Sequence, residues 1–191
     1  MLGLLGHALA DQGRRGEARR CYEEALATHR KVGNERHEAD VLLRLADLLA
    51  DASHHEEAAR QLEAALPLYR ALGGPTGAAR VHRSLGIVHA DMGELSEARR
   101  HLDTAWRLLG ESASAERSRV AIARAALAAH ETRVSDVARW LSLAGSSQTP
   151  EALACQAWLA KRSGDEDTFS RLAGLVAETG SRRAQAIVAK A

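Results

Sequence analysis

The sequence predicts an all-α protein built as a solenoid of stacked helical hairpins, and three observations lead to this fold class. Hydrophobic residues make up 46% of the 191 residues, whereas aromatic residues make up only 3%. Ala, Leu and Arg dominate, as is typical of helices that pack through small and aliphatic side chains. The third observation is an internal repeat of 40 residues, because a fixed period indicates repeated structural units.

Five columns of the repeat hold similar residues in one register. They are Leu5, Leu45 and Leu85; Gly6, Ala46 and Gly86; Gly13, Ser53 and Gly93; Ala18, Ala58 and Ala98; and Ala25, Ala65 and Ala105. Each repeat carries two helical stripes separated by a short turn, which predicts a helical hairpin. The small residues lie where two helices cross closely, and one hairpin cannot bury its apolar face without a stacked neighbour.

The elements follow in order along the chain as one solenoid over residues 1–191. We expect hairpins over residues 2–32, 36–72, 76–110, 115–145 and 149–179, and a capping helix over 181–191. Ser53-His54-His55-Glu56 has the spacing of a capping box for the second helix of repeat two. Thr149-Pro150 marks the start of the fifth hairpin, with Pro at the first helical position.

The sequence of the second helix of the fourth repeat can be aligned with the other repeats in two registers. One places Ala138 in the small column; the other places Val137, Leu141 and Ala144 in three core columns, and we favour it because it restores three positions together. Trp140 falls in a polar column in either register. It is therefore either a structural lid beneath the chain's irregular end, which we favour, or a candidate hot spot for a partner.

The first three repeats resemble the tetratricopeptide repeat (TPR) family. The residues that carry the resemblance in repeat one are Leu5-Gly6, Leu9, Ala18, Tyr22 and Ala25. The family's usual period is about 34 residues, and the 40-residue period here is similar to a longer-helix variant in bacterial signalling regulators and peptide-binding adaptors. The resemblance implies a right-handed superhelix whose first helices line a concave groove for a protein or peptide partner.

Counting from the family's groove positions contributes to the candidate partner-binding residues. That count places on the concave side His7, Asp47, Arg80, Arg83, Ile87, Arg124, His130 and Lys161. Together with a column of acids that recurs along the chain, it gives the candidate partner-binding residues Asp11, Asp47, Asp51, Arg80, Arg83, Asp91, Arg124 and Glu131. Four of these acids recur every 40 residues near the end of a first helix and would favour a partner offering Lys, Arg or an amino terminus. The arginines would clamp a carboxylate. The alternatives are that the acids only solubilise the turns and that each Arg pairs within the stack.

Other function classes are disfavoured. No phosphate loop, paired-Cys pattern or acid–base constellation is present, so we expect no enzyme, cofactor or metal site. His82 and His89 are expected to pack with a satisfied ring nitrogen. A net charge of +1, with Glu placed ahead of Arg at ion-pair spacing, disfavours nucleic acid. No apolar run approaches the roughly 20 residues of a membrane span, and we expect a cytoplasmic bacterial protein.

The sequence therefore favours a protein–protein interaction scaffold that binds a peptide or partner protein. The second hypothesis is a sensor or oligomerisation domain of a larger bacterial regulator of the STAND or transcription-factor type, and it includes homo-oligomerisation. It is favoured because Met1 leads into the first helix without a polar cap. An enzyme with a site between helices is the weakest alternative.

Overall fold

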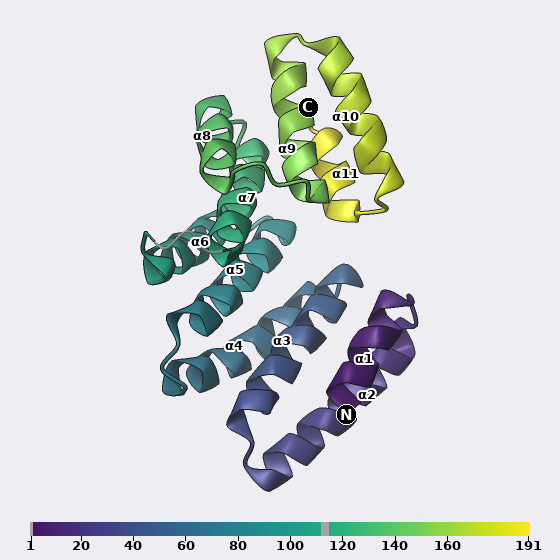
Figure 1. Ribbon diagram of the computed structural model, residues 1–191, viewed down its shortest axis with the longest axis vertical. Coiled ribbons are helices and arrows are strands. Elements are labelled where there is room, and N and C mark those ends of the chain that lie inside the picture. Colours follow the sequence, from purple (N-terminus) through teal and green to yellow (C-terminus); the bar gives the residue numbers. More distant parts are fainter. Residues whose placement is uncertain (1, 112–114) are drawn as a thin grey trace. The chain divides into compact units, whose positions relative to one another are not determined.

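The computed structural model describes residues 2–111 and 115–191, and all regular secondary structure within these ranges is α-helical (Figure 1). The described helices are α1 (Leu2–Asp11), α2 (Arg15–Val32), α3 (Glu35–Asp51), α4 (His55–Ala71), α5 (Pro75–Asp91), α6 (Leu95–Leu109), α7 (Ala115–His130), α8 (Val134–Ala144), α9 (Pro150–Ser163), α10 (Glu166–Glu178) and α11 (Arg182–Val188). The predicted all-α, TPR-like solenoid fold class is confirmed.

One column of the repeat supplies the turn inside each hairpin. Gly13, Ser53 and Gly93 have φ angles of 75°, 64° and 82°, a left-handed conformation that glycine adopts without steric cost. The expected capping box at Ser53 is therefore wrong. The residue that precedes α4 is His54, which makes no side-chain capping bond, because Ser53 is used to turn the chain.

The fourth repeat is displaced by one residue relative to the first three. Its left-handed turn residue is Thr132 (φ 57°), one position before the place that the 40-residue period gives. Val137 is fully buried, Ala144 is buried and Leu141 is half-buried, whereas Ala138 is exposed. The favoured register of α8 is therefore confirmed, and the shift begins at the turn before the helix.

Side-chain caps fix the starts of several other helices. The Asn34 side chain accepts a hydrogen bond from the His37 amide at the start of α3. Thr149, Asp165 and Ser181 accept equivalent amide hydrogen bonds at α9, α10 and α11. Each cap satisfies an amide that has no partner within the helix. The capping role expected from Thr149-Pro150 is confirmed.

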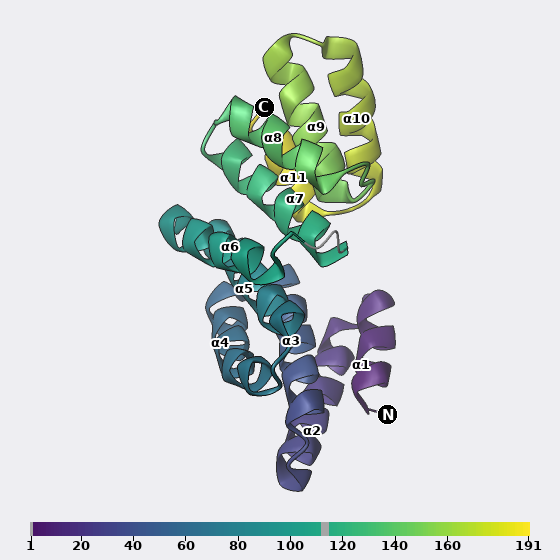
Figure 2. The same ribbon diagram turned by 60° about the vertical axis from the view of Figure 1, so that its left-hand side comes forward.

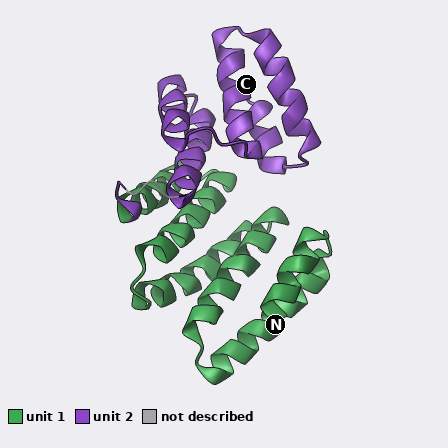
Figure 3. Cartoon of the chain, in the orientation of Figure 1, with its two compact units in different colours: residues 1–108 green, residues 109–191 purple. Residues whose placement is uncertain are grey.

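The chain forms two compact units, residues 1–108 and residues 109–191 (Figure 3). The expectation of one continuous solenoid over residues 1–191 stays a prediction. In the first unit each hairpin is a pair of antiparallel helices joined by a tight turn (Figure 2). The second helix of one hairpin packs against the first helix of the next, and α3 also contacts both α1 and α5. The first helices of successive hairpins are therefore neighbours.

Small residues allow the two helices of each hairpin to approach closely. All six alanines of the two Ala columns, at positions 18, 25, 58, 65, 98 and 105, are at most 1% exposed. A Cβ atom at Gly6 would lie 2.8 Å from the Tyr22 ring, and one at Gly86 would lie 2.6 Å from Cγ of Leu102. These distances are shorter than van der Waals contact, so the crossings depend on glycine.

The second unit is organised around α9. This helix contacts α7, α8, α10 and α11, and half of its residues are buried, Cys155 and Trp158 completely. A helix that is apolar on several sides must be surrounded by others. The short α11 packs against α9, α10 and α7.

Candidate functional site

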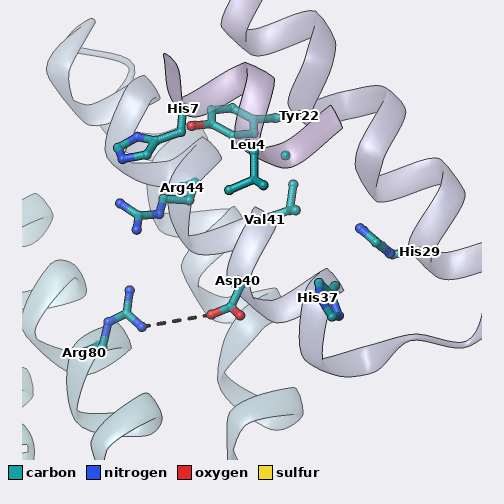
Figure 4. Close-up of a pocket in the computed structure, with 10 residues that line it drawn as sticks. Leu4, His7, Tyr22, His29, His37, Asp40, Val41, Arg44 and Arg80 are labelled. Atoms are coloured by element: carbon teal, nitrogen blue, oxygen red, sulfur yellow. Dashed lines mark ion pairs between the residues drawn. The ribbon is translucent and has the colours of Figure 1, made fainter. Parts of the chain in front are cut away.

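The first unit contains an open pocket of about 570 Å³ (Figure 4). Four helices of the first three hairpins contribute to it: α1, α2, α3 and α5. Its lining residues are Gly3, Leu4, His7, Tyr22, His29, His37, Asp40, Val41, Arg44 and Arg80. The volume is in the range of small-ligand sites, so the pocket is large enough for a few side chains of a peptide.

The contact of α1 and α5 with the two sides of α3 positions these side chains. On α3, residues 37 and 41 and residues 40 and 44 are four positions apart, and residues 37 and 40 are three apart, so the four side chains share one face of that helix. Leu4 and Val41 are the aliphatic side chains of the lining, and the Tyr22 ring lies next to Leu4 (Figure 4). Leu4 is 77% exposed, whereas Val41 is 6% exposed, so the apolar surface that a partner can reach here is that of Leu4.

The charged groups of the pocket are unevenly distributed. Arg44 and Arg80 lie on one side of it, with Asp40 next to them (Figure 4). The Asp40 carboxylate accepts a hydrogen bond of 2.5 Å from the Tyr69 hydroxyl, and its distance to the nearest guanidinium nitrogen of Arg80 is 4.0 Å. Within residues 2–111 and 115–191, Arg44 makes no hydrogen bond or ion pair. The two arginines thus leave positive charge uncompensated.

Two tyrosine hydroxyl groups lie within reach of these charges. Burial, and then the hydrogen bond donated to Asp40, raise the pKa of Tyr69 well above its usual range, while Arg80 and Arg44 oppose the increase. Burial likewise raises the pKa of Tyr22, and the charge of Arg44 again opposes it. Arg44 is therefore close enough to both phenol groups to influence them, although it is bonded to neither. Tyr69 remains protonated and holds Asp40 in place.

Histidine side chains line other parts of the pocket. His29 and His37 stack with their ring centroids 5.2 Å apart, on the side away from the arginines (Figure 4). His37 Nδ1 is 2.9 Å from Oδ1 of the capping residue Asn34. His7 Nδ1 lies 3.8 Å from the carboxylate of Asp11.

Of the eight candidate partner-binding residues, Arg80 lines this pocket, and so does His7, which the family's groove positions also place on the concave side. Asp11 lies next to the pocket, because its carboxylate is 3.8 Å from Nδ1 of the lining residue His7. Asp51 and Asp91 are exposed at the ends of α3 and α5. Asp47 accepts a hydrogen bond of 3.4 Å from the Ser84 hydroxyl, and Arg83 is half-buried on α5.

Two predicted residues belong to the second unit. The guanidinium carbon of Arg124 lies 3.8 Å from the centroid of the Trp140 ring, a stacked geometry that is favourable for Arg. The Glu131 side chain is 11% exposed and forms an ion pair of 2.5 Å with Arg133. That the groove spans all eight predicted residues stays a prediction.

Trp140 is 7% exposed. The hot-spot hypothesis requires an accessible ring, whereas the lid hypothesis requires a covered one. The burial of the ring, together with the Arg124 stack, therefore favours a structural role.

A second polar cluster lies inside the third hairpin. His82 and His101 are 4% and 8% exposed, and their Nδ1 atoms are 3.0 Å apart; His89 stacks on His101 with the ring centroids 5.3 Å apart. Burial, followed by the positive charge of Arg100, lowers the pKa of His101 to about 4, and burial also lowers that of His82. As expected for His82, the ring packs with a bonded nitrogen. Among the described side chains, no three are placed to bind a metal ion together.

Sequence reasoning missed most of the pocket. Asp40 and Arg80 are 40 residues apart and therefore occupy the same column of neighbouring repeats, as do Leu4 and Arg44. Extending each candidate groove position by one period in both directions would have found Asp40. The contribution of α2, through Tyr22 and His29, carries no such signal, because second helices are not expected to line the groove.

None of the helices in the described ranges combines the length and the apolar character needed to cross a membrane.

The fold is that of a helical-repeat scaffold, and its first unit contains an open pocket. The family model for the tetratricopeptide repeat matches residues 1–71 and 38–111. The chain therefore belongs to the tetratricopeptide repeat family, and the resemblance seen in the sequence is confirmed. No curated protein matches the chain.

Solved structures of the same fold include three similar proteins. Rap protein complexed with competence and sporulation factor superposes with a TM-score of 0.79 at 17% identity, over 94% of this chain and 52% of the Rap chain. The apo form of RapI gives a TM-score of 0.78 at 14% identity, over 93% and 52%. A putative kinesin light chain of Podosopora anserina with nearly identical TPR-like repeats gives 0.68 at 17%, over 100% and 95%. This chain thus spans about half the length of the Rap structures.

Proposed function

We propose that this protein is an interaction scaffold that binds a peptide, or an extended segment of a partner protein, in the pocket formed by α1, α2, α3 and α5. The observation that carries the proposal is the open pocket of about 570 Å³ on a repeat scaffold. It combines the exposed apolar side chain of Leu4 with charged groups, and a mixture of apolar and charged contacts gives a binding surface both affinity and specificity.

The repeat architecture supports this function. Stacked hairpins present the side chains of successive first helices on one continuous surface, which a chain in extended conformation can follow. The repeat fold is typically a non-catalytic scaffold, and the described pocket holds no nucleophile paired with a general base. Among the similar structures, the Rap protein is in complex with the competence and sporulation factor, which is consistent with binding by this fold.

Site-specific photo-crosslinking tests the proposal. A photoreactive phenylalanine analogue replaces Leu4 inside the pocket in one variant, and in the matched control it replaces Val32, which is 67% exposed at the end of α2 and outside the pocket. Irradiation in cells of the source organism should give a discrete crosslinked product at position 4 and not at position 32. Equal labelling at both positions, or no product at position 4, would refute binding at this pocket.

A regulatory role for the same scaffold is the second candidate function. It is favoured by the likeness to the two Rap structures, in which this chain corresponds to 52% of each. In this case occupancy of the pocket changes the oligomeric state or a contact with another domain. Sedimentation velocity with and without a bound peptide should then show a change in mass, and an unchanged monomer in both would count against it.

A further inference from the structure

We propose that the outer face of α1, formed by Leu5 and Ala8, is an interaction surface for a second copy of this protein, in which the two α1 helices pack antiparallel. The helix α1 lies at one end of the first unit (Figures 1 and 2). The residues that α1 contributes to the pocket are Gly3, Leu4 and His7, so the outer face is a different surface. The inference is therefore independent of the proposed function.

The first argument is a difference in burial within one column of the repeat. Leu45 and Leu85 are 4% and 1% exposed, whereas Leu5, in the same column, is 51% exposed. The column three positions further along shows the same difference, because residues 48 and 88 are buried and Ala8 is exposed. A surface that is covered in repeats two and three is thus open to solvent in repeat one.

The helix contacts identify what covers this surface in the later repeats. The helix α3 packs against α1 and α2, and α5 packs against α3 and α4. In both cases the cover includes the hairpin that precedes the helix, whereas α1 contacts α2 and α3, which follow it. The outer face of α1 therefore corresponds to a helix–helix interface that the chain forms twice within itself.

The second argument is the apolar character of α1. Eight of its ten residues are Leu, Ala or Gly, yet the buried ones are Gly6 and Leu9. A helix that is apolar on all sides is normally surrounded by other helices, and the outermost repeat of a solenoid needs a polar outer face for solubility. A partner that covers Leu5 and Ala8 would remove this apolar surface from water.

The third argument identifies the partner as a second copy. Leu5, Ala8 and Gln12 follow one stripe at helical spacing and carry no charge, so two copies can meet there without repulsion between like charges. In an antiparallel pair related by a twofold axis, Leu5 of each copy faces Ala8 of the other. A large side chain then meets a small one at both contacts, which allows close packing, and the antiparallel helix dipoles attract each other.

The size of the face sets the strength of the association. A helix of ten residues is about 15 Å long, which is too short to bury the roughly 800 Å² per partner of a standard interface. We therefore expect a weak dimer in reversible equilibrium with the monomer.

Sedimentation velocity of the full chain tests this surface, in a concentration series from about 10 µM to about 1 mM, the range in which a weak dimer forms. The test variant is Leu5→Glu. The matched control is Leu143→Glu, which introduces the same charge at a Leu of similar exposure, 48%, on α8 in the second unit.

The unchanged protein and the Leu143→Glu control should shift from monomer toward dimer as the concentration rises. Leu5→Glu should raise the Kd of the dimer about ten-fold or more, because the dimer would bury a carboxylate against an apolar side chain. If circular dichroism shows a loss of helix in Leu5→Glu, the neutral variant Leu5→Gln takes its place.

A mixture of two variants tests the antiparallel arrangement. Ala8→Lys alone should also weaken the dimer, but mixed with Leu5→Glu it should associate more strongly than either variant does alone. The introduced carboxylate then faces the introduced ammonium group across the interface, and added salt should weaken this association.

Two results would overturn the proposal: a chain that stays monomeric throughout the series, and a dimer that Leu5→Glu forms as readily as the unchanged protein. A mixture that associates no better than its two components would overturn the antiparallel arrangement. Because the pocket is unchanged in every variant, each of these results leaves the proposed function standing.

Discussion

Replacing Gly86 by Ala should weaken the third hairpin, and the size of the effect follows from the structure. The new Cβ atom would lie 2.6 Å from Cγ of Leu102 and 3.1 Å from the carbonyl oxygen of Ala98. The first distance is about 1 Å shorter than an ordinary carbon–carbon contact. Because Leu102 is 1% exposed, its side chain has little room to move, and we expect an overpacking cost of about 1–3 kcal/mol.

The matched control is Gly16→Ala. Gly16 is exposed in the first turn of α2, and an added Cβ atom there meets nothing within 4 Å. Both substitutions gain helix propensity, at most about 1 kcal/mol in a helix interior. The overpacking term is therefore the main difference between the variants, and Gly86→Ala should be less stable than Gly16→Ala by about 1–3 kcal/mol.

Urea unfolding followed by far-UV circular dichroism measures the difference. The chain has two compact units, so the unfolding curve from circular dichroism is first compared with the curve from Trp fluorescence. If the two curves coincide, the free energies of unfolding of both variants refer to the same transition. A Gly86→Ala variant as stable as Gly16→Ala would contradict the close crossing of α5 and α6, and with it the explanation of the small-residue column.

Three further predictions address other parts of the chain. His101→Gln introduces the residue type that repeat two has at Gln61, and it should make the stability less sensitive to acid. The pKa of His101 is about 4 in the folded state and about 6.5 in the unfolded state, so the unfolded state binds more protons and the stability decreases as the pH falls from 6.5 to 4. Urea midpoints at about pH 7 and pH 5 check this, and a difference between the two midpoints that is the same in the variant as in the parent contradicts it. Trp140→Ala should cost about 3–5 kcal/mol, as for other buried aromatic residues, and a variant that melts like the parent would refute the lid. Asp51→Asn/Asp91→Asn should leave folding intact and weaken binding of a basic partner in a salt-dependent way, whereas unchanged affinity at low salt would leave solubility as the role of the acidic column.

The repeat made the fold predictable. Five columns with a constant period identify the hairpin positions, the buried alanines and the turn residue, because each column reports a steric requirement that recurs in every repeat. Ser53 shows the limit of local motifs. Its sequence neighbourhood satisfies the capping-box pattern, but the turn needs a left-handed residue at that position, and the requirement of the turn prevails.

The candidate site was less predictable because it depends on which side chains neighbouring helices bring together. Groove positions inferred from the family selected His7 and Arg80. They missed Arg44, which occupies in repeat two the position that Leu4 occupies in repeat one. The acids at the helix ends are prominent in the sequence because they recur, but recurrence alone does not place them in a pocket. The contribution of α2 arises from packing between hairpins, which a one-dimensional pattern does not contain.

The central claim is that the pocket bounded by α1, α2, α3 and α5 receives the partner. A crystal structure of this protein with the partner segment identified by crosslinking tests it most directly. The peptide should lie against Leu4 and contact lining residues of α1, α2, α3 and α5. A peptide bound to another surface, with this pocket filled only by solvent, would contradict it.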